Sequence, residues 1–215
     1  MTDVGQSKSG NAFHLRTIGP EPSGATPLEP EDLEGLIPEF VTTRADLNVV
    51  EFENIAKAMP WALRQARVLG TEGILAYGFM MDLHSHMFSD VWTWAGIPRR
   101  RETNIGVTPH LIPSQAMQVL DDAKYWHTEE VFDPDDLAAR IHCRLVSIHP
   151  FVNGNGRCTR LMADLYLTTI GSSRPFSWGG TNLDVDGSGR NKYIAALVKA
   201  ANTGDYADLV RFARA

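Results

Sequence analysis

The stretch "SIHPFVNGNGRCTRLMADLYL", residues 147–167, decides how this chain is interpreted. Its second half has the apolar pattern of a buried helix, yet Arg157 and Arg160 stand in the opening turn. The N-terminus of a helix carries unpaired N–H groups and about half a positive charge, so it favours acidic groups. Each arginine opposes this preference by about 0.3–1 kcal/mol. The sequence therefore predicts an anion bound at the start of this helix.

The residues just before the helix have the composition of an anion cradle. Gly154 and Gly156 permit a tight turn and let backbone N–H groups approach a ligand closely. Backbone N–H groups at the start of a helix bind phosphate. Arg157 and Arg160 lie three residues apart on one helix face, from which both can reach phosphate oxygens. Two side-chain amides flank the glycines and add further polar groups: Asn153 and Asn155.

His149 stands where one predicted helix ends and this loop begins. A histidine beside a polyphosphate site can remove the proton from a hydroxyl that attacks a phosphoryl group. Taken singly, these residues have ordinary structural explanations, such as a core histidine or an arginine paired with an acid elsewhere. The ordered set His-Pro-Phe-x-x-Gly-Asn-Gly-Arg-x-x-Arg is far more specific than its parts.

The segments before and after the motif have apolar residues at helical spacing, so the predicted fold class is mainly α. Thr43 with Asp46 forms a capping box that opens a helix, whose inward stripe we predict as Leu47, Val50, Ile55 and Met59. Pro60 is predicted to interrupt this helix. Asp133 followed by Pro134 opens the helix that runs into the motif, with one face formed by Leu137, Ile141, Leu145 and Ile148. The other predicted helices cover residues 61–70, 71–88, 114–127, 157–170, 191–202 and a short segment after Asp205.

Composition predicts four segments. Residues 1–35 are rich in Gly, Pro and Ser and are interpreted as a flexible or extended N-terminal arm. Residues 36–71 are predicted to form N-terminal helices, and residues 72–170 form the core that carries the motif, which the resemblance of that motif to a known family implies to be catalytic, with residues 36–71 as a possible regulatory segment. Residues 171–215 supply a loop and helices that pack on this core. Within the core, residues 90–113 lack a helical period and are expected to form a long functional loop or hairpin.

Charge and cysteine content exclude several classes of protein. The net charge of −6 argues against general binding of nucleic acid or anionic membrane, so we predict neither partner. No apolar run reaches the ~18 residues of a membrane span, and no signal peptide is evident. The two cysteines, Cys143 and Cys158, form neither a metal motif nor a disulfide framework. These features predict a cytoplasmic protein.

The motif also resembles a known family. "HPFVNGNGRCTR", residues 149–160, resembles the signature of Fic-domain (Fic/DOC) proteins, which mostly transfer AMP from ATP to protein hydroxyl groups. "LHSHMFSDVWTWAGIPR", residues 83–99, is similar to the segment before the active-site flap of that family. Residues 36–55 and 178–213 resemble a subgroup called mobile mystery protein B. The resemblance implies a Fic-like helical bundle with a short β-hairpin flap over the active site.

The resemblance further implies the roles of individual residues. His149 would be the base for the hydroxyl of a target protein. The nucleotide phosphates of ATP would be held by Asn153, Gly154, Asn155, Gly156, Arg157 and Arg160. The flap would align a target segment by strand addition. The flap residues expected to dock the target are Asn104, Ile105, Gly106, Leu111 and Ile112.

One position departs from the family pattern. The family usually has Asp or Glu where this chain has Asn153, and that acid helps to hold Mg²⁺ between the phosphates. An amide oxygen can ligate Mg²⁺ but brings no charge. Asn153 is therefore expected to be a weak metal ligand, and transfer is expected to be slower, or the reaction or nucleotide to differ.

A second family feature is an inhibitory helix, Ser/Thr-x-x-x-Glu-Gly/Asn, whose glutamate pairs with the arginine that matches Arg160. Residues 49–54 and 68–73 come near this pattern, although both begin with valine. Glu53 is the candidate for an internal inhibitor, and a solvated glutamate is the alternative. An external inhibitor, as in a toxin–antitoxin pair, would serve equally well. Two other functions stay open: a nucleotide-binding regulatory module, and transfer or removal of another phosphate-containing group.

Overall fold

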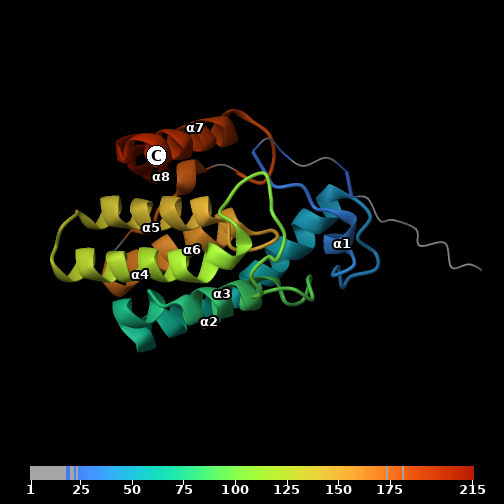
Figure 1. Cartoon of the computed structure of the whole chain (residues 1–215), viewed down its shortest axis with the longest axis horizontal. Helices are drawn as coiled ribbons and strands as arrows, with labels where there is room; N and C mark the ends of the chain where they lie inside the picture. The colour runs from blue at the N-terminus through green and yellow to red at the C-terminus, as the bar shows by residue number, and fades with distance from the viewer. Residues whose placement is uncertain (1–17, 20–21, 23, 173, 181) are drawn as a thin grey trace, which may run out of the picture.

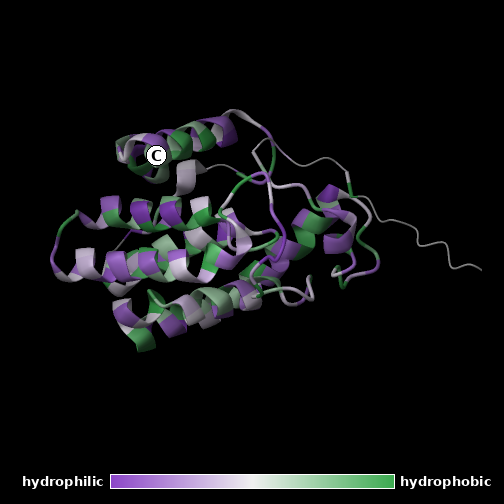
Figure 2. Cartoon of the chain, in the orientation of Figure 1, coloured by the Kyte–Doolittle hydropathy of each residue, from purple (hydrophilic) through white to green (hydrophobic). Residues whose placement is uncertain are grey.

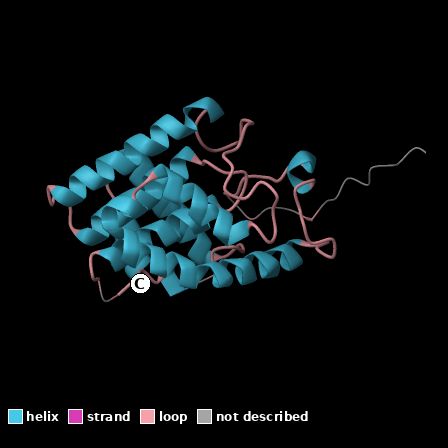
Figure 3. Cartoon of the chain, turned by 90° about the horizontal axis from the view of Figure 1, so that it is seen from below, coloured by secondary structure: helices cyan, strands magenta, loops and turns pink. Residues whose placement is uncertain are grey.

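The computed structural model describes residues 18–215 except 20, 21, 23, 173 and 181. The described part is a bundle of α-helices, as Figures 1 and 3 show. Its elements are α1 (Pro30–Leu33), α2 (Arg44–Ile74), α3 (Tyr77–Phe88), η1 (Pro109–Leu111), α4 (Ile112–Thr128), α5 (Pro134–Ile148), α6 (Asn155–Thr169), η2 (Trp178–Gly180), α7 (Ser188–Thr203) and α8 (Ala207–Arg214). The predicted mainly α class is confirmed.

The predicted β-hairpin flap is wrong in its secondary structure. In the described ranges, extended pairing is limited to an isolated bridge between Leu36 and Trp92. Residues 98–108 form an irregular loop that leads into η1. This loop is held by a buried arginine, described below, and not by cross-strand hydrogen bonds.

Helices α5 and α6 form the centre of the bundle. They pack against each other, and the turn that joins them carries the motif. Helices α2 and α3 pack on the α6 side, whereas α7 and α8 cover α5 (Figure 1). Hydrophobic and hydrophilic residues alternate along the helices in Figure 2, as expected when each helix buries one face. The core therefore holds the motif turn from both sides.

The helix that leads into the motif forms as predicted. Pro134 occupies the first position of α5, where its missing N–H costs no hydrogen bond. The predicted inward face is buried, with Leu137 and Leu145 0% exposed and Ile148 4% exposed. The buried face of α5 thereby fixes the position at which the motif begins.

Helix α2 differs from the prediction in two ways. It continues through Pro60, which lies on an exposed face, and its non-helical position is Gly70, with φ +62°. Packing of the buried face compensates for the hydrogen bond that proline removes. The predicted stripe is also shifted: Val50, Ile55 and Met59 are only partly buried. The fully buried face consists of Leu47, Glu51, Asn54, Ala58, Ala62, Ala66 and Ile74.

The second half of the predicted arm is packed. Residues 24–35 include α1, and its Leu33 is 6% exposed. Asp32 is 7% exposed and forms an ion pair with Arg101 of the loop after α3. Within the arm expected at residues 1–35, residues 24–29 have no regular secondary structure and α1 adds one helical turn, while residues 1–17, 20–21 and 23 lie outside the described residues. Across the part of the chain described, no helix has the length and apolar character needed to cross a bilayer.

Candidate active site

The motif turn contains two residues with a left-handed backbone, His149 and Gly154. Helix α5 ends at His149 in the left-handed conformation, with φ 56° and ψ 61°. Gly154 is the N-cap of α6, with φ 78°, and a Cβ there would lie 2.5 Å from the Phe88 ring. Asn155 closes the turn, since its side chain accepts from Phe151 N and donates to Phe151 O, each at 2.8 Å. Its amide thus holds the loop in shape instead of facing a ligand.

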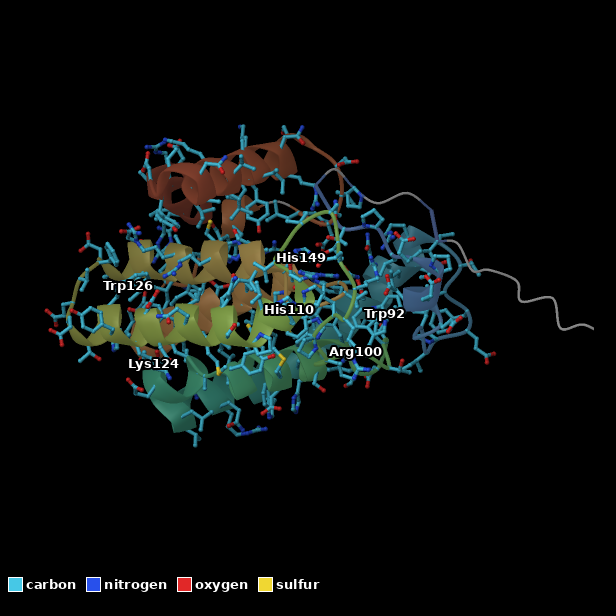
Figure 4. All side chains as sticks on the ribbon, in the orientation of Figure 1. Trp92, Arg100, His110, Lys124, Trp126 and His149 are labelled. Carbon is cyan, nitrogen blue, oxygen red and sulfur yellow. The ribbon has the colours of Figure 1, made fainter. Side chains whose placement is uncertain are left out.

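His149 is buried beside a hydroxyl. Its side chain lies at the end of α5 where the loops gather (Figure 4), and the residue is 8% exposed. Nε2 lies 2.8 Å from Thr26 Oγ1. Burial, and then the charge of Arg99, lower the pKa of His149 to about 4. The ring is therefore neutral at pH 7 and can accept a proton.

His84 ties the motif loop to the segment before the flap. Its Nδ1 accepts from Gly96 N at 2.9 Å, and its Nε2 donates to Asn153 O at 3.0 Å. The ring also stacks on Phe151, with centroids 3.7 Å apart. Burial lowers the pKa of His84 to about 3, so the ring stays neutral with one donor and one acceptor. His84 is thus a positioning residue for the loop.

A cavity of about 480 Å³ opens beside His149 and contains the predicted cradle. Its wall includes the loop 153–157, Arg160 on α6, and Tyr193 on α7. The Arg160 guanidinium lies over the Tyr193 ring and donates to Tyr193 Oη at 3.3 Å. A volume of this size is typical of a small-molecule site. The structure thereby brings His149 and both motif arginines to one cavity.

A buried glutamate occupies the cationic side of this cavity. Glu51 of α2 is 1% exposed, and its Oε2 accepts from Arg157 Nη1 at 2.7 Å. Its Oε1 accepts from Trp92 Nε1 at 2.6 Å and from Asn153 Nδ2 at 3.0 Å. The expected internal glutamate, Glu53, is exposed on the opposite face of α2. Glu53 thus fits the alternative of a solvated glutamate, and the glutamate that contacts a motif arginine is Glu51, which pairs with Arg157.

Arg99 fastens the flap loop to the motif turn. It is 3% exposed, its Nε donates to His149 O at 2.7 Å, and its Nη2 donates to Val107 O. The backbone adds two bonds: Arg99 N donates to Pro150 O at 2.9 Å, and Val107 N donates to Ile148 O at 3.2 Å. The Arg99 guanidinium is planar and carries five N–H donors, so it can bind several carbonyl oxygens at once.

The predicted flap residues divide into two groups. Four of them are exposed near the site: Asn104, Ile105, Gly106 and Leu111. Ile112 is 0% exposed because it begins α4 and packs in the core, so it is corrected to a core residue. Gly106 has φ 108°, and a Cβ there would lie 2.6 Å from His149 Cβ. The loop therefore approaches the histidine too closely for a side chain at this position.

Four residues at the site were not predicted from the sequence: Thr26, Glu51, His84 and Arg99. For Glu51 a signal exists, because it stands in the same helix stripe as Leu47 and Asn54, a face that proves to be buried. A carboxylate on a buried face needs partners, which here come from the motif. Nothing in the spacing of the chain places Thr26 against a histidine 123 residues away.

The geometry defines a helical bundle in which a cavity lined by Arg157 and Arg160 lies beside the buried His149. Residues 75–167 match the model of the Fic/DOC family. The chain is 33% identical over 121 residues to "Protein adenylyltransferase fic-1" of Caenorhabditis elegans, which covers 55% of this chain. It is 35% identical over 78 residues to "Protein adenylyltransferase Fic" of Nematostella vectensis, covering 34% of this chain. The chain spans 22% and 18% of the lengths of these two relatives.

Solved structures share the fold. Fic-1 of C. elegans (residues 134–508) superposes with a TM-score of 0.59 at 26% identity, covering 85% of this chain and 56% of that chain. BepC of Bartonella tribocorum, solved with bound AMPPNP, superposes with a TM-score of 0.63 at 12% identity. That match covers 85% of this chain and 95% of BepC. The Fic-like bundle expected from the sequence is confirmed.

Proposed function

We propose that this chain is a protein adenylyltransferase, which transfers AMP from ATP to a Ser, Thr or Tyr hydroxyl of a protein. One observation carries the proposal: the neutral His149 ring lies 2.8 Å from a hydroxyl and lines the cavity that holds Arg157 and Arg160. A base and a cationic phosphate cradle on one cavity are the two requirements of phosphoryl-type transfer. The relatives named as adenylyltransferases support the same reaction.

Each residue of the site has a role in this proposal. His149 takes the proton from the acceptor hydroxyl. The backbone N–H groups at the start of α6, with Arg157 and Arg160, hold the phosphates. Asn155 keeps the loop in shape through Phe151. The exposed flap residues Asn104, Ile105, Gly106 and Leu111 are the proposed surface for docking the target.

Mg²⁺ is the proposed companion of ATP at this site. Mg²⁺ is usually held by one or two carboxylates together with substrate phosphates and water. The protein donors nearest the cradle are Asn153 Oδ1 and Glu51, whose Oε1 lies 3.0 Å from Asn153 Nδ2. Among the described residues, no group of three or more His, Cys, Asp or Glu side chains is placed to hold a metal ion. The donor set fits an ion held mainly by the nucleotide, whose phosphate charge it would reduce.

A transfer assay with a His149→Ala variant tests the proposal. The protein is incubated with α-labelled ATP, Mg²⁺ and cell lysate, and labelled protein bands are counted. His149→Ala should abolish labelling while nucleotide binding persists. The matched control is His86→Ala, which removes an exposed histidine on α3. Equal labelling by His149→Ala and the unchanged protein would refute the assignment.

One observation favours a second function, a nucleotide-binding regulatory module that needs an inhibitor or partner. Glu51 already occupies Arg157, so the cradle of this chain is closed by its own carboxylate. An antitoxin-like partner could hold this closed state or release it. The two functions differ in turnover: a module binds nucleotide without transferring AMP.

For the location, the buried free thiols of Cys143 and Cys158 support the proposed cytoplasmic compartment.

A further inference from the structure

We propose that His142 and Tyr193 are positioning residues for Arg160, which fix its guanidinium at the start of α6 for the phosphates of a nucleotide. This inference rests on the proposed function, in which Arg160 binds phosphate. Neither positioning residue belongs to the motif, and Tyr193 lies on α7, beyond the residues 75–167 that match the Fic/DOC model. Arg160 Nη1 donates to Tyr193 Oη at 3.3 Å, and this Oη lies 2.9 Å from His142 Nε2.

The same hydrogen-bonded path continues from His142 to the motif turn. His142 Nδ1 lies 2.9 Å from Thr159 Oγ1, and Thr159 Oγ1 donates to Asn155 O at 2.8 Å. The middle of the path is enclosed, since His142 and Thr159 are 0% exposed and Tyr193 is 3% exposed. A buried polar group that loses its partner is costly, so these bonds hold one another in place. The path thus joins the guanidinium of Arg160 to the backbone at which α6 begins.

The position of each proton in this path follows from the number of donors. The Thr159 hydroxyl has one proton and gives it to Asn155 O, so Thr159 Oγ1 accepts from His142. Burial, and then the charge of Arg160, lower the pKa of His142 well below its usual value, so its ring is neutral and has one N–H. That proton is on Nδ1, and Nε2 accepts from Tyr193 Oη. The Tyr193 oxygen is thereby oriented to accept from Arg160.

Packing fixes the guanidinium in the same place as the hydrogen bonds do. Arg160 Cζ lies 5.4 Å from the centroid of the Tyr193 ring. On its other neighbour, Gly156, a Cβ would lie 3.2 Å from Arg160 Nη1, so the missing side chain leaves room for the guanidinium. The Tyr193 ring in turn packs against Phe212 of α8, with centroids 5.8 Å apart. The C-terminal helices α7 and α8 thereby support an arginine of the motif.

This arrangement prepares Arg160 to bind phosphate. One N–H of its guanidinium is used by Tyr193, whereas a guanidinium carries five donors, and Arg160 lines the cavity beside His149. An arginine that is already held in one orientation loses less conformational entropy when it binds a ligand. Removal of the Tyr193 hydroxyl should therefore weaken binding of the phosphates and leave binding of the nucleoside unchanged.

Titration of the full chain with ATP and with adenosine tests the proposal. Tyr193→Phe keeps the ring and removes the hydroxyl, so it should weaken ATP binding about tenfold and leave adenosine binding unchanged. The matched control is Tyr166→Phe, which removes a buried hydroxyl of α6 that contacts His127 of α4. This control should bind both ligands as the unchanged protein does. A Glu51→Gln version of each protein is titrated in parallel, so that Glu51 does not compete with phosphate.

A double-variant cycle separates positioning from a general loss of stability. In the Arg160→Ala background, Tyr193→Phe should not weaken ATP binding further, because the residue that it positions is absent. A tenfold loss in both backgrounds would overturn the inference, since Tyr193 would then act without Arg160. His142→Gln combined with Tyr193→Phe should likewise bind ATP no more weakly than Tyr193→Phe alone.

The role of His142 is also tested without a variant, by its tautomer. Long-range proton–nitrogen NMR spectra of the full chain should show His142 protonated on Nδ1 and unprotonated on Nε2. In Tyr193→Phe the Nε2 resonance should shift, because its hydrogen-bond donor is lost. A proton on Nε2 in the unchanged protein would overturn the proposed path.

The outcomes separate this inference from the proposed function, because ATP binding is measured without transfer. Equal ATP affinity of Tyr193→Phe and the unchanged protein, with labelling of lysate proteins intact, would overturn this inference alone. The expected loss of ATP affinity, with no protein labelled by the unchanged protein or by Glu51→Gln, would support the positioning role and overturn the transferase function. No binding of ATP by the unchanged protein or by Glu51→Gln would overturn both.

Discussion

Glu51 Oε2 of α2 lies 2.7 Å from Arg157 Nη1 of α6, and the two residues are 106 positions apart in the chain. Helix α2 thereby places a carboxylate where the cradle would receive a phosphate oxygen. Both anions would use the same guanidinium donor, so they compete. Binding of a phosphate at Arg157 therefore depends on where α2 places Glu51.

Glu51→Gln is expected to raise nucleotide affinity at least tenfold. The amide keeps a hydrogen-bonding oxygen but removes the charge that competes with phosphate, and about 1.4 kcal/mol corresponds to tenfold. Titration of a fluorescent ATP analogue measures the change. Glu53→Gln, which removes an exposed glutamate two residues away, should bind as the unchanged protein does. Equal affinities for the two variants would contradict competition at Arg157.

Asn153→Asp is expected to destabilise the ligand-free protein by about 1–3 kcal/mol. The Asn153 amide donates to Glu51 Oε1 at 3.0 Å, and an aspartate would replace this bond with repulsion between its half-buried carboxylate and the buried carboxylate of Glu51. Thermal unfolding should show the loss, and ATP with Mg²⁺ should restore more stability than in the unchanged protein. The double variant Glu51→Gln, Asn153→Asp should recover the ligand-free stability. If Asn153→Asp alone unfolds at the original temperature, this account of Asn153 is wrong.

Arg99→Lys is expected to loosen the flap and reduce labelling of protein targets more than nucleotide binding. Arg99 donates to carbonyl oxygens of the motif turn and of the flap, a pattern that a single ammonium group cannot reproduce. Loss of these buried bonds should also lower the free energy of unfolding by about 1–3 kcal/mol. Arg100→Lys changes the exposed neighbouring arginine (Figure 4) and should alter neither property. A parallel fall in nucleotide affinity would show that Arg99 acts on the cradle instead.

Stability is expected to fall as the pH drops from 7 towards 4. Burial lowers the pKa of His84 to about 3 and of His149 to about 4, and it also lowers the pKa of His142. The unfolded chain binds protons on these histidines below about pH 6.5, whereas the folded chain does not. The unfolded state is therefore favoured by acid, by about 1.4 kcal/mol per pH unit for each histidine. Urea unfolding at pH 7, 6 and 5 should show this dependence of the free energy of unfolding on pH. His149→Asn should reduce the dependence by the contribution of one histidine, about 1.4 kcal/mol per pH unit.

The motif could be predicted from the sequence because its chemistry is local. The histidine and glycines at 149–156 lie in and beside the turn between α5 and α6, and both arginines lie in the first turns of α6, so their order in the chain already places them together. Pro134 and the apolar face of α5 fix that turn through local propensity and burial. Contacts across the chain could not be predicted in this way. Glu51 reaches Arg157, and Thr26 reaches His149, through packing that no short spacing encodes.

The errors in α2 and the flap have physical causes. Pro60 was expected to end a helix, but a proline on an exposed face is tolerated when the opposite face is packed. Small and polar residues on the buried face of α2 hid its orientation, because apolar spacing favoured Val50, Ile55 and Met59. The flap was expected to be a hairpin, yet its shape depends on the single buried side chain of Arg99.

The left-handed backbone at His149 implies a conflict between thermal stability and the proposed transfer activity. The left-handed conformation costs an L-residue about 1–2 kcal/mol, a cost that asparagine reduces by local hydrogen bonding, and burying an imidazole adds a desolvation cost. Asparagine at this position should therefore yield a protein that withstands heat better than the natural chain and transfers nothing. Under the proposed function, a histidine at this position serves transfer at the expense of heat resistance.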